Sequence, residues 1–111
     1  MRVAFQPWPE HDNGLGYLNG GIIATLLDCH SAAAVMVAAE RRGLAPDRTV
    51  QYVTAGIDVR YRRPSPLQEP AELLARLVSA AEEEIVVDAE LWWQDKVRAT
   101  ATSTWKRWRP R

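Results

Sequence analysis

One carboxylate lies in the longest apolar run of the chain. The segment from Gly20 to Ala39 places Ile, Leu, Val and Ala on every side of a helical projection, and Asp28 is its one acidic residue. A helix that is apolar all round is buried, so we expect a buried central helix here. A buried acid with a perturbed environment is a functional candidate, although a structural acid satisfied by backbone or hydroxyl donors is the open alternative.

The residues before this segment favour a helix start that binds a polarised oxygen. Asn19 is a favoured N-cap, and Gly20 and Gly21 follow it without side chains. We expect the N–H groups of Gly20, Gly21 and Ile22 to be free and to point out of the helix. Together with the helix dipole they would form an oxyanion hole, and tight packing of the helix start is the alternative.

The spacing of these two features predicts where they act. Asp28 lies seven residues beyond Gly21, on the same face of the helix, among small residues. At about 1.5 Å per residue, Gly20 and Asp28 are about 12 Å apart, too far for one carbonyl group to contact both. We therefore expect a site between two subunits, in which Asp28 of one faces the glycine pair of the other.

The rest of the chain predicts one antiparallel sheet around this helix. We expect an edge strand within residues 1–7, a loop over 8–17, and a helix that ends around Glu40 to Arg42, with Gly43 as its C-cap. Strands are predicted over 52–61, 71–81, 85–93 and 97–105, although leucine spacing in 71–81 also suits a helix. Residues 1–111 then form a single α+β domain, and its open sheet face and edges favour a homodimer.

Composition excludes several classes of function. The chain has 14 basic and 14 acidic residues, so no net charge favours nucleic acid. Asp28 and His30 in the apolar run count against a membrane span, and Met1–Pro9 shows no signal peptide. The single cysteine, Cys29, fits a cytoplasmic protein and is expected to be buried. Two histidines and one cysteine show no metal-ligand spacing, and His30 is expected to be a hydrogen-bonded core or interface residue rather than a catalyst.

Two motifs give the chain a family resemblance. From Pro9 to Trp105 it resembles the hotdog-fold acyl-CoA thioesterases, in the branch of the phenylacetic-acid-pathway and 4-hydroxybenzoyl-CoA enzymes. The resemblance is carried by the proline turn after Tyr61 and by one glycine-rich motif, whose matching residues are His11, Asn13, Gly16, Asn19, Gly20, Gly21 and Asp28. It implies a hotdog fold, with a five-stranded antiparallel sheet (six strands being the alternative) wrapped around one long helix.

The resemblance also implies catalytic roles. Asp28 would be the nucleophile or the general base, and the N–H of Gly20 or Gly21 would hold the carbonyl oxygen. Asn13 would orient substrate or water, with a turn residue as the alternative reading. Thr54 would position the water from the partner chain, with an ordinary strand threonine as the alternative.

Further residues are expected at the substrate. Asn19 stands where many relatives carry His, and it keeps the cap but cannot take a proton. His11 is expected near the substrate, and charge alone suggests that Arg60, Arg62 and Arg63 contact the phosphates of coenzyme A. No separate cofactor is expected, because coenzyme A is part of the substrate.

The resulting hypothesis is hydrolysis of an acyl-CoA by a homodimer or a dimer of dimers. The alternatives are a non-catalytic hotdog protein that binds acyl thioesters and a hydroxyacyl-thioester dehydratase. A dehydratase pairs a catalytic histidine with an acid, so Asn19 counts against it.

Overall fold

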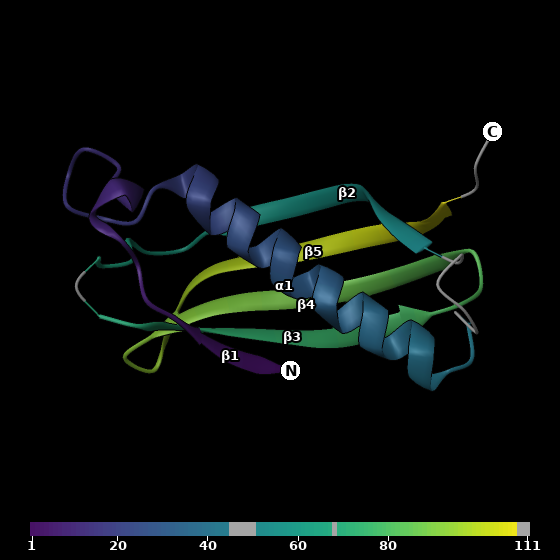
Figure 1. The fold of residues 1–111 in the computed structure, drawn as a ribbon. Coiled ribbons are helices and arrows are strands. Elements are labelled where there is room, and N and C mark those ends of the chain that lie inside the picture. Colours follow the sequence, from purple (N-terminus) through teal and green to yellow (C-terminus); the bar gives the residue numbers. More distant parts are fainter. Residues whose placement is uncertain (45–50, 68, 109–111) are drawn as a thin grey trace.

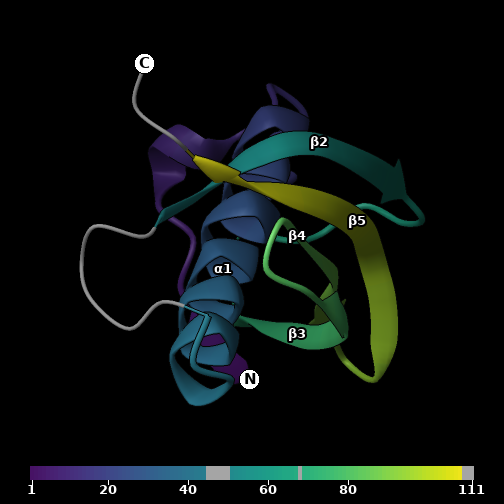
Figure 2. The same ribbon diagram turned by 90° about the vertical axis from the view of Figure 1, so that its right-hand side faces the viewer.

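One long helix crosses one face of a five-stranded antiparallel sheet (Figure 1). The computed structural model describes residues 1–44, 51–67 and 69–108. The sheet order is β1-β3-β4-β5-β2, and in the side view the sheet curls around the helix (Figure 2). The elements are β1 (Arg2–Phe5), the short 3-10 helix η1 (Pro9–His11), α1 (Gly20–Arg41), β2 (Gln51–Tyr61), β3 (Ala71–Ala80), β4 (Glu84–Trp93) and β5 (Lys96–Trp108). The predicted α+β class is confirmed.

Helix α1 begins and ends where the sequence predicted. The Asn19 side chain caps its first turn, and Gly43 follows its end with a φ of 68°. That positive φ is readily adopted by glycine, which has no Cβ to clash. By length and apolar composition α1 also passes as a membrane span, but it packs on the sheet as the core helix.

The helix is buried on one face within a single chain. The buried side is Ile23, Leu27, His30, Ser31, Val35, Ala38 and Ala39. The expectation of burial on every side is therefore wrong for one chain, because the sheet covers only one side. On the outer side Met36 is 71% exposed, and Cys29 is exposed rather than buried.

Small side chains let the helix lie close to the sheet. Ala75, Ala89 and Ala101 are paired across β3, β4 and β5, and all three are buried. Larger buried residues, among them Ile85, Leu91 and Trp105, lie on the same strands. Alternation of small and large residues fills the layer between sheet and helix. Segment 71–80 is a strand, so the helical alternative is excluded.

The outer face of the sheet is mostly polar. Thr102 donates a hydrogen bond of 2.8 Å to Asp88, and Lys106 pairs with Glu84. Charged and hydroxyl side chains can face water, so the expectation that this face needs a cover is not supported. Strands β1 and β2 form the two edges of the sheet, and these edges still favour a dimer.

Candidate functional site

The carboxylate of Asp28 is held by a hydroxyl from the edge strand β2. Thr54 Oγ1 donates to Asp28 Oδ1 over 3.0 Å. No other donor from the described residues reaches this carboxylate, so Oδ2 is open to an incoming group. Asp28 is half-buried and Thr54 is exposed, so the pair lies at the surface of a single chain. Thr54 thus contacts Asp28 of its own chain, whereas we expected it to act from a partner.

A bulge in β2 turns Thr54 toward the helix. The register with β5 passes from Thr54 opposite Trp105 to Gly56 opposite Thr104, which leaves Ala55 as an extra residue. A bulge re-aims the side chains beside it. As a result Thr54 and Tyr61, which simple alternation would place on opposite faces, both contact α1.

The helix start is less open than the sequence suggested. The Asn19 Oδ1 accepts hydrogen bonds from the N–H of Gly21 at 2.8 Å and of Ile22 at 3.4 Å. Of the three N–H groups predicted to be free, only that of Gly20 has no acceptor among the described residues. The Gly21 and Ile22 donors are engaged because the residue that caps the helix binds the same N–H groups.

Tyr61 is a contact that the sequence did not indicate. Its hydroxyl donates to the carbonyl of Gly20 over 2.7 Å. Its ring lies beside the same residue, since a Cβ on Gly20 would be 3.5 Å from ring atoms. Strand β2 is therefore tied to α1 at two points, Tyr61 to Gly20 and Thr54 to Asp28.

The loop before the helix is held by its own side chains. Asn13 Oδ1 accepts from the N–H of Leu15 at 2.8 Å, and Asp12 Oδ1 accepts from Gly14 at 2.8 Å and Gly16 at 2.9 Å. Asn13 thus acts as a turn residue, which was the alternative interpretation from the sequence. The amide NH₂ of Asn13 has no acceptor among the described residues, so its contact with a substrate stays a prediction.

The two histidines make structural hydrogen bonds. His11 Nδ1 accepts from the N–H of Trp8 at 2.9 Å, and the two rings stack. His30 is buried, and its Nε2 lies 3.1 Å from the carbonyl oxygen of Met1, as expected for a core histidine. The proposed contact of His11 with a substrate stays a prediction.

The three arginines predicted to contact the phosphates differ in whether their side chains have hydrogen-bond partners. Arg60 binds Asp58 through two hydrogen bonds of 2.9 and 3.2 Å, and Arg63 donates to the carbonyl of Val97. The hydrogen bond and charge of Arg60 lower the pKa of Asp58, and the pKa of Arg60 is raised in return. Only Arg62 has a side chain without a partner among the described residues, so it is the freest of the three.

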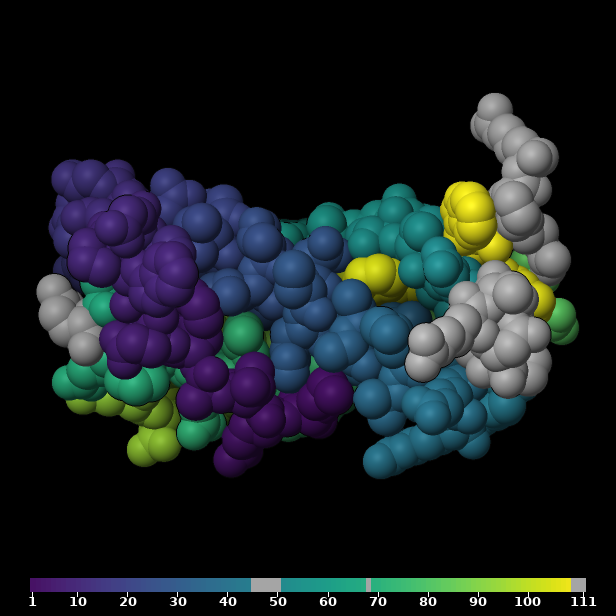
Figure 3. Space-filling view, viewed as in Figure 1, coloured from purple at the N-terminus to yellow at the C-terminus, as the bar shows by residue number. Residues whose placement is uncertain are grey.

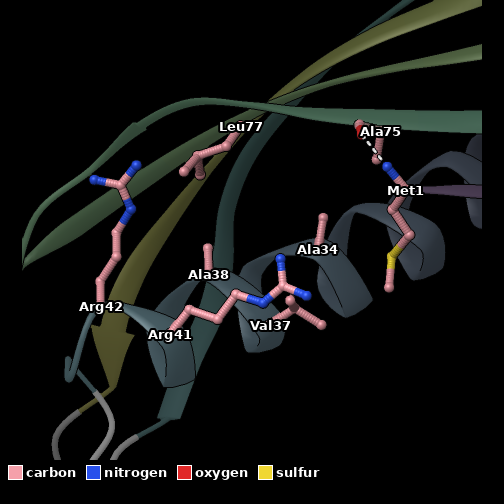
Figure 4. A pocket seen from close by; sticks show the side chains of 8 residues that line it. All are labelled: Met1, Ala34, Val37, Ala38, Arg41, Arg42, Ala75 and Leu77. Atoms are coloured by element: carbon pink, nitrogen blue, oxygen red, sulfur yellow. Dashed lines mark hydrogen bonds between the residues drawn. The ribbon is translucent and has the colours of Figure 1, made fainter.

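Two surface hollows lie away from Asp28. One, of about 280 Å³, lies between the last turns of α1 and β3 and is lined by Arg41 and Arg42 among others (Figure 4). The last turns of α1 lie at the surface in the space-filling view (blue, lower right of Figure 3). At about 100° per residue, this side of α1 points away from Asp28. The other, of about 290 Å³, lies beside Trp92 and Trp93. Neither is lined by Thr54, Asp28 or the helix start, so neither hollow belongs to the candidate site.

Solved structures show the same fold. A thioesterase superfamily protein from Shewanella loihica PV-4 superposes with a TM-score of 0.79 at 26% identity, over 97% of this chain and 82% of that one. A Bacillus halodurans protein crystallised with CoA has a TM-score of 0.83 at 26% identity, over 99% and 68%. A phenylacetic acid degradation-related protein from Ralstonia eutropha JMP134, described as a putative thioesterase, has 0.82 at 22% identity, over 95% and 74%. The hotdog fold is thereby confirmed.

The family is shown by its model. The model of the thioesterase superfamily matches residues 15–100. No curated protein sequence matches the chain. The chain belongs to the thioesterase superfamily, and the resemblance seen in the sequence is confirmed.

Proposed function

We propose that the protein hydrolyses an acyl-CoA to a free acid and coenzyme A. The observation that carries this proposal is the Asp28 carboxylate, fixed through Oδ1 by Thr54 while Oδ2 has no donor from the described residues. In a chain of the thioesterase superfamily, such a group suits attack on a thioester. The binding of CoA to the Bacillus halodurans relative supports coenzyme A as the thiol part.

Two chemical routes fit this carboxylate. As a general base, Asp28 takes a proton from water while the water oxygen bonds to the thioester carbon. The tetrahedral oxyanion then collapses, the carbon–sulfur bond breaks, and the thiolate of coenzyme A takes up a proton. As a nucleophile, Asp28 bonds to the carbon itself and forms an anhydride that water hydrolyses. In both routes the N–H groups of Gly20 or Gly21 stabilise the oxyanion.

The proposed site requires two chains. Gly20 and Asp28 are separated by about 12 Å along α1, so one carbonyl group cannot contact both within one chain. The outer side of α1, with exposed Met36, and the edge strand β2, with exposed Val53, are the surfaces that would meet. A cytoplasmic homodimer, alone or as a dimer of dimers, is thus part of the proposal.

Turnover of a panel of acyl-CoAs, followed with a thiol-trapping dye, tests the proposal. Asp28→Asn is expected to lower kcat by at least ~10²-fold, because the amide cannot accept the proton. The matched control is Asp88→Asn, since Asp88 also accepts from a threonine hydroxyl but on the outer sheet face. Absence of wild-type turnover on the whole panel, or full turnover by Asp28→Asn, would refute the proposal.

The geometry of the helix start also supports a second function, the binding of acyl thioesters without hydrolysis. The Asn19 side chain already occupies the N–H of Gly21, which suits a protein that binds acyl thioesters without hydrolysing them. Calorimetry that shows tight binding of acyl-CoA, without hydrolysis over hours, would favour this function. A dehydratase lacks such support, because His11 and His30 are both engaged elsewhere.

A further inference from the structure

Tyr61 contacts the peptide that carries one of the proposed oxyanion donors. Its hydroxyl donates to the carbonyl oxygen of Gly20 over 2.7 Å. That carbonyl belongs to the same planar peptide unit as the N–H of Gly21. Because the unit is rigid, the direction of the carbonyl also fixes the direction of this N–H.

Two consecutive glycines make the helix start a place where an added restraint has an effect. Gly20 and Gly21 are consecutive glycines in the first turn, where N–H groups have no intrahelical acceptors. Glycine has the greatest backbone freedom of any residue, so this turn loses the most entropy when it is held in one geometry. The Asn19 carbonyl oxygen accepts from the N–H of Ile23 at 3.0 Å. The Gly20 carbonyl lies in the first turn of α1, where it accepts the helical bond, and the Tyr61 hydroxyl adds a second restraint on this peptide.

The same hydrogen bond strengthens the donor. A hydrogen bond to a peptide carbonyl polarises the peptide and makes its N–H a better donor, since hydrogen bonds in chains reinforce one another. This series of hydrogen bonds runs from Tyr61 Oη through the Gly20–Gly21 peptide to the acceptor of the Gly21 N–H. In the structure this acceptor is Asn19 Oδ1 at 2.8 Å, and a substrate oxygen would share or replace it.

We propose that Tyr61 is a positioning residue that orients and polarises the Gly20–Gly21 peptide toward a developing oxyanion. The inference rests on the proposed thioester hydrolysis. It assigns the N–H of Gly21 as a donor in the transition state. The hydroxyl of Tyr61 itself does not touch the substrate, and its effect should appear in kcat rather than in substrate binding.

Tyr61→Phe tests the inference, because it removes one hydroxyl and keeps the ring beside Gly20. We expect kcat for an acyl-CoA to fall about threefold to tenfold, the effect of one neutral hydrogen bond, with KM changed less than twofold. The ¹⁵N resonance of the Gly21 amide should also shift. The matched control is Tyr52→Phe, since the Tyr52 hydroxyl also donates over 2.7 Å to a backbone carbonyl, that of Glu82. This control should change neither kcat nor the Gly21 resonance.

The outcomes separate this inference from the proposed function. If Tyr61→Phe keeps wild-type kcat while Asp28→Asn is inactive, the inference is wrong and the hydrolysis stands. An effect confined to KM, or to the dimer content measured by light scattering, would also overturn it. If the wild type hydrolyses no acyl-CoA, both fail. Tyr61 is 55% exposed, so we expect the variant to fold, and its thermal transition is measured alongside.

Discussion

Thr54 and Asp28, 26 positions apart in the sequence, are joined by a hydrogen bond of 3.0 Å between Oγ1 and Oδ1. The bond connects the edge strand β2 to the middle of α1 on the helix side of the sheet. A second pair of the same chemistry, Thr102 and Asp88, lies at 2.8 Å on the outer face. The chain thus contains the same interaction in a candidate site and in a surface that faces away from it.

Removal of the Thr54 hydroxyl should impair catalysis without removing the carboxylate. We expect Thr54→Val to lower kcat/KM about tenfold or more, because a hydrogen bond to a charged group is worth about 1.5–3 kcal/mol. Thr54→Ser, which keeps a hydroxyl, should retain most of the activity. Thr102→Val is the control and should leave kcat/KM at the wild-type value. A Thr54→Val enzyme with wild-type kinetics would show that Asp28 acts without this partner.

The extents of the elements were predictable, but the contacts across them were not. The pattern of residues located the ends of α1 and the strands within about three residues. Thr54 and Tyr61 are an odd number of positions apart, so alternation places them on opposite faces of β2. The bulge at Ala55 brings both to the helix, and its one signal in the sequence is Gly56, an isolated glycine inside the strand.

The helix start is a second place where the sequence predicted the element but not its contacts. The sequence indicates that Asn19 caps α1, and it does. It does not indicate how many N–H groups the cap leaves free, because that depends on the rotamer of one side chain. Burial of α1 was overestimated for a related reason: apolar residues on all sides indicate burial, but not whether the same chain supplies every cover.

Loss of a buried side chain under α1 should lower the free energy of unfolding far more than loss of an exposed apolar side chain. Leu27 is fully buried between α1 and the sheet, so we expect Leu27→Ala to lower the free energy of unfolding by about 2–5 kcal/mol. Leu15, which is 79% exposed, provides the control, and Leu15→Ala should change it by less than about 0.5 kcal/mol. Urea denaturation followed by circular dichroism measures both. Equal losses would place the hydrophobic core elsewhere.

Alkaline pH should weaken the attachment of β2 through Tyr52. Burial raises the pKa of Tyr52 above its ordinary value of 10.0, and Glu82 and Glu83 add to the rise while Arg107 opposes it. Because the folded-state pKa is raised, the stabilisation is complete below pH 10 and is lost as pH rises through the folded value. Urea midpoints between pH 8 and 11.5 should fall less steeply for Tyr52→Phe than for the wild type. Parallel curves would show that Tyr52 ionises as it does in the unfolded chain.

Arg62 is the best candidate for contact with the phosphates of coenzyme A, since no described residue engages its side chain. Arg62→Gln should raise KM for an acyl-CoA about threefold to tenfold and leave KM for the matching N-acetylcysteamine thioester unchanged, because the latter has no phosphates. The difference should shrink in high salt, which screens exposed charges. Arg76→Gln, on the outer face beside Glu90, is the control. Equal KM changes for the two thioesters would exclude a phosphate contact.

Substitutions of Asn19 should distinguish the effect of the helix cap on stability from its effect on catalysis. Asn19→Ala should lower the free energy of unfolding by about 1 kcal/mol, because the N–H groups of Gly21 and Ile22 lose their acceptor. Asn19→Asp keeps the cap, and a carboxylate is favoured at a helix start, so its unfolding should match the wild type. Its kcat should nevertheless fall at least about tenfold, because a negative charge beside the N–H of Gly20 and Gly21 opposes a developing oxyanion. Wild-type turnover by Asn19→Asp would mean that the oxyanion forms away from this helix start.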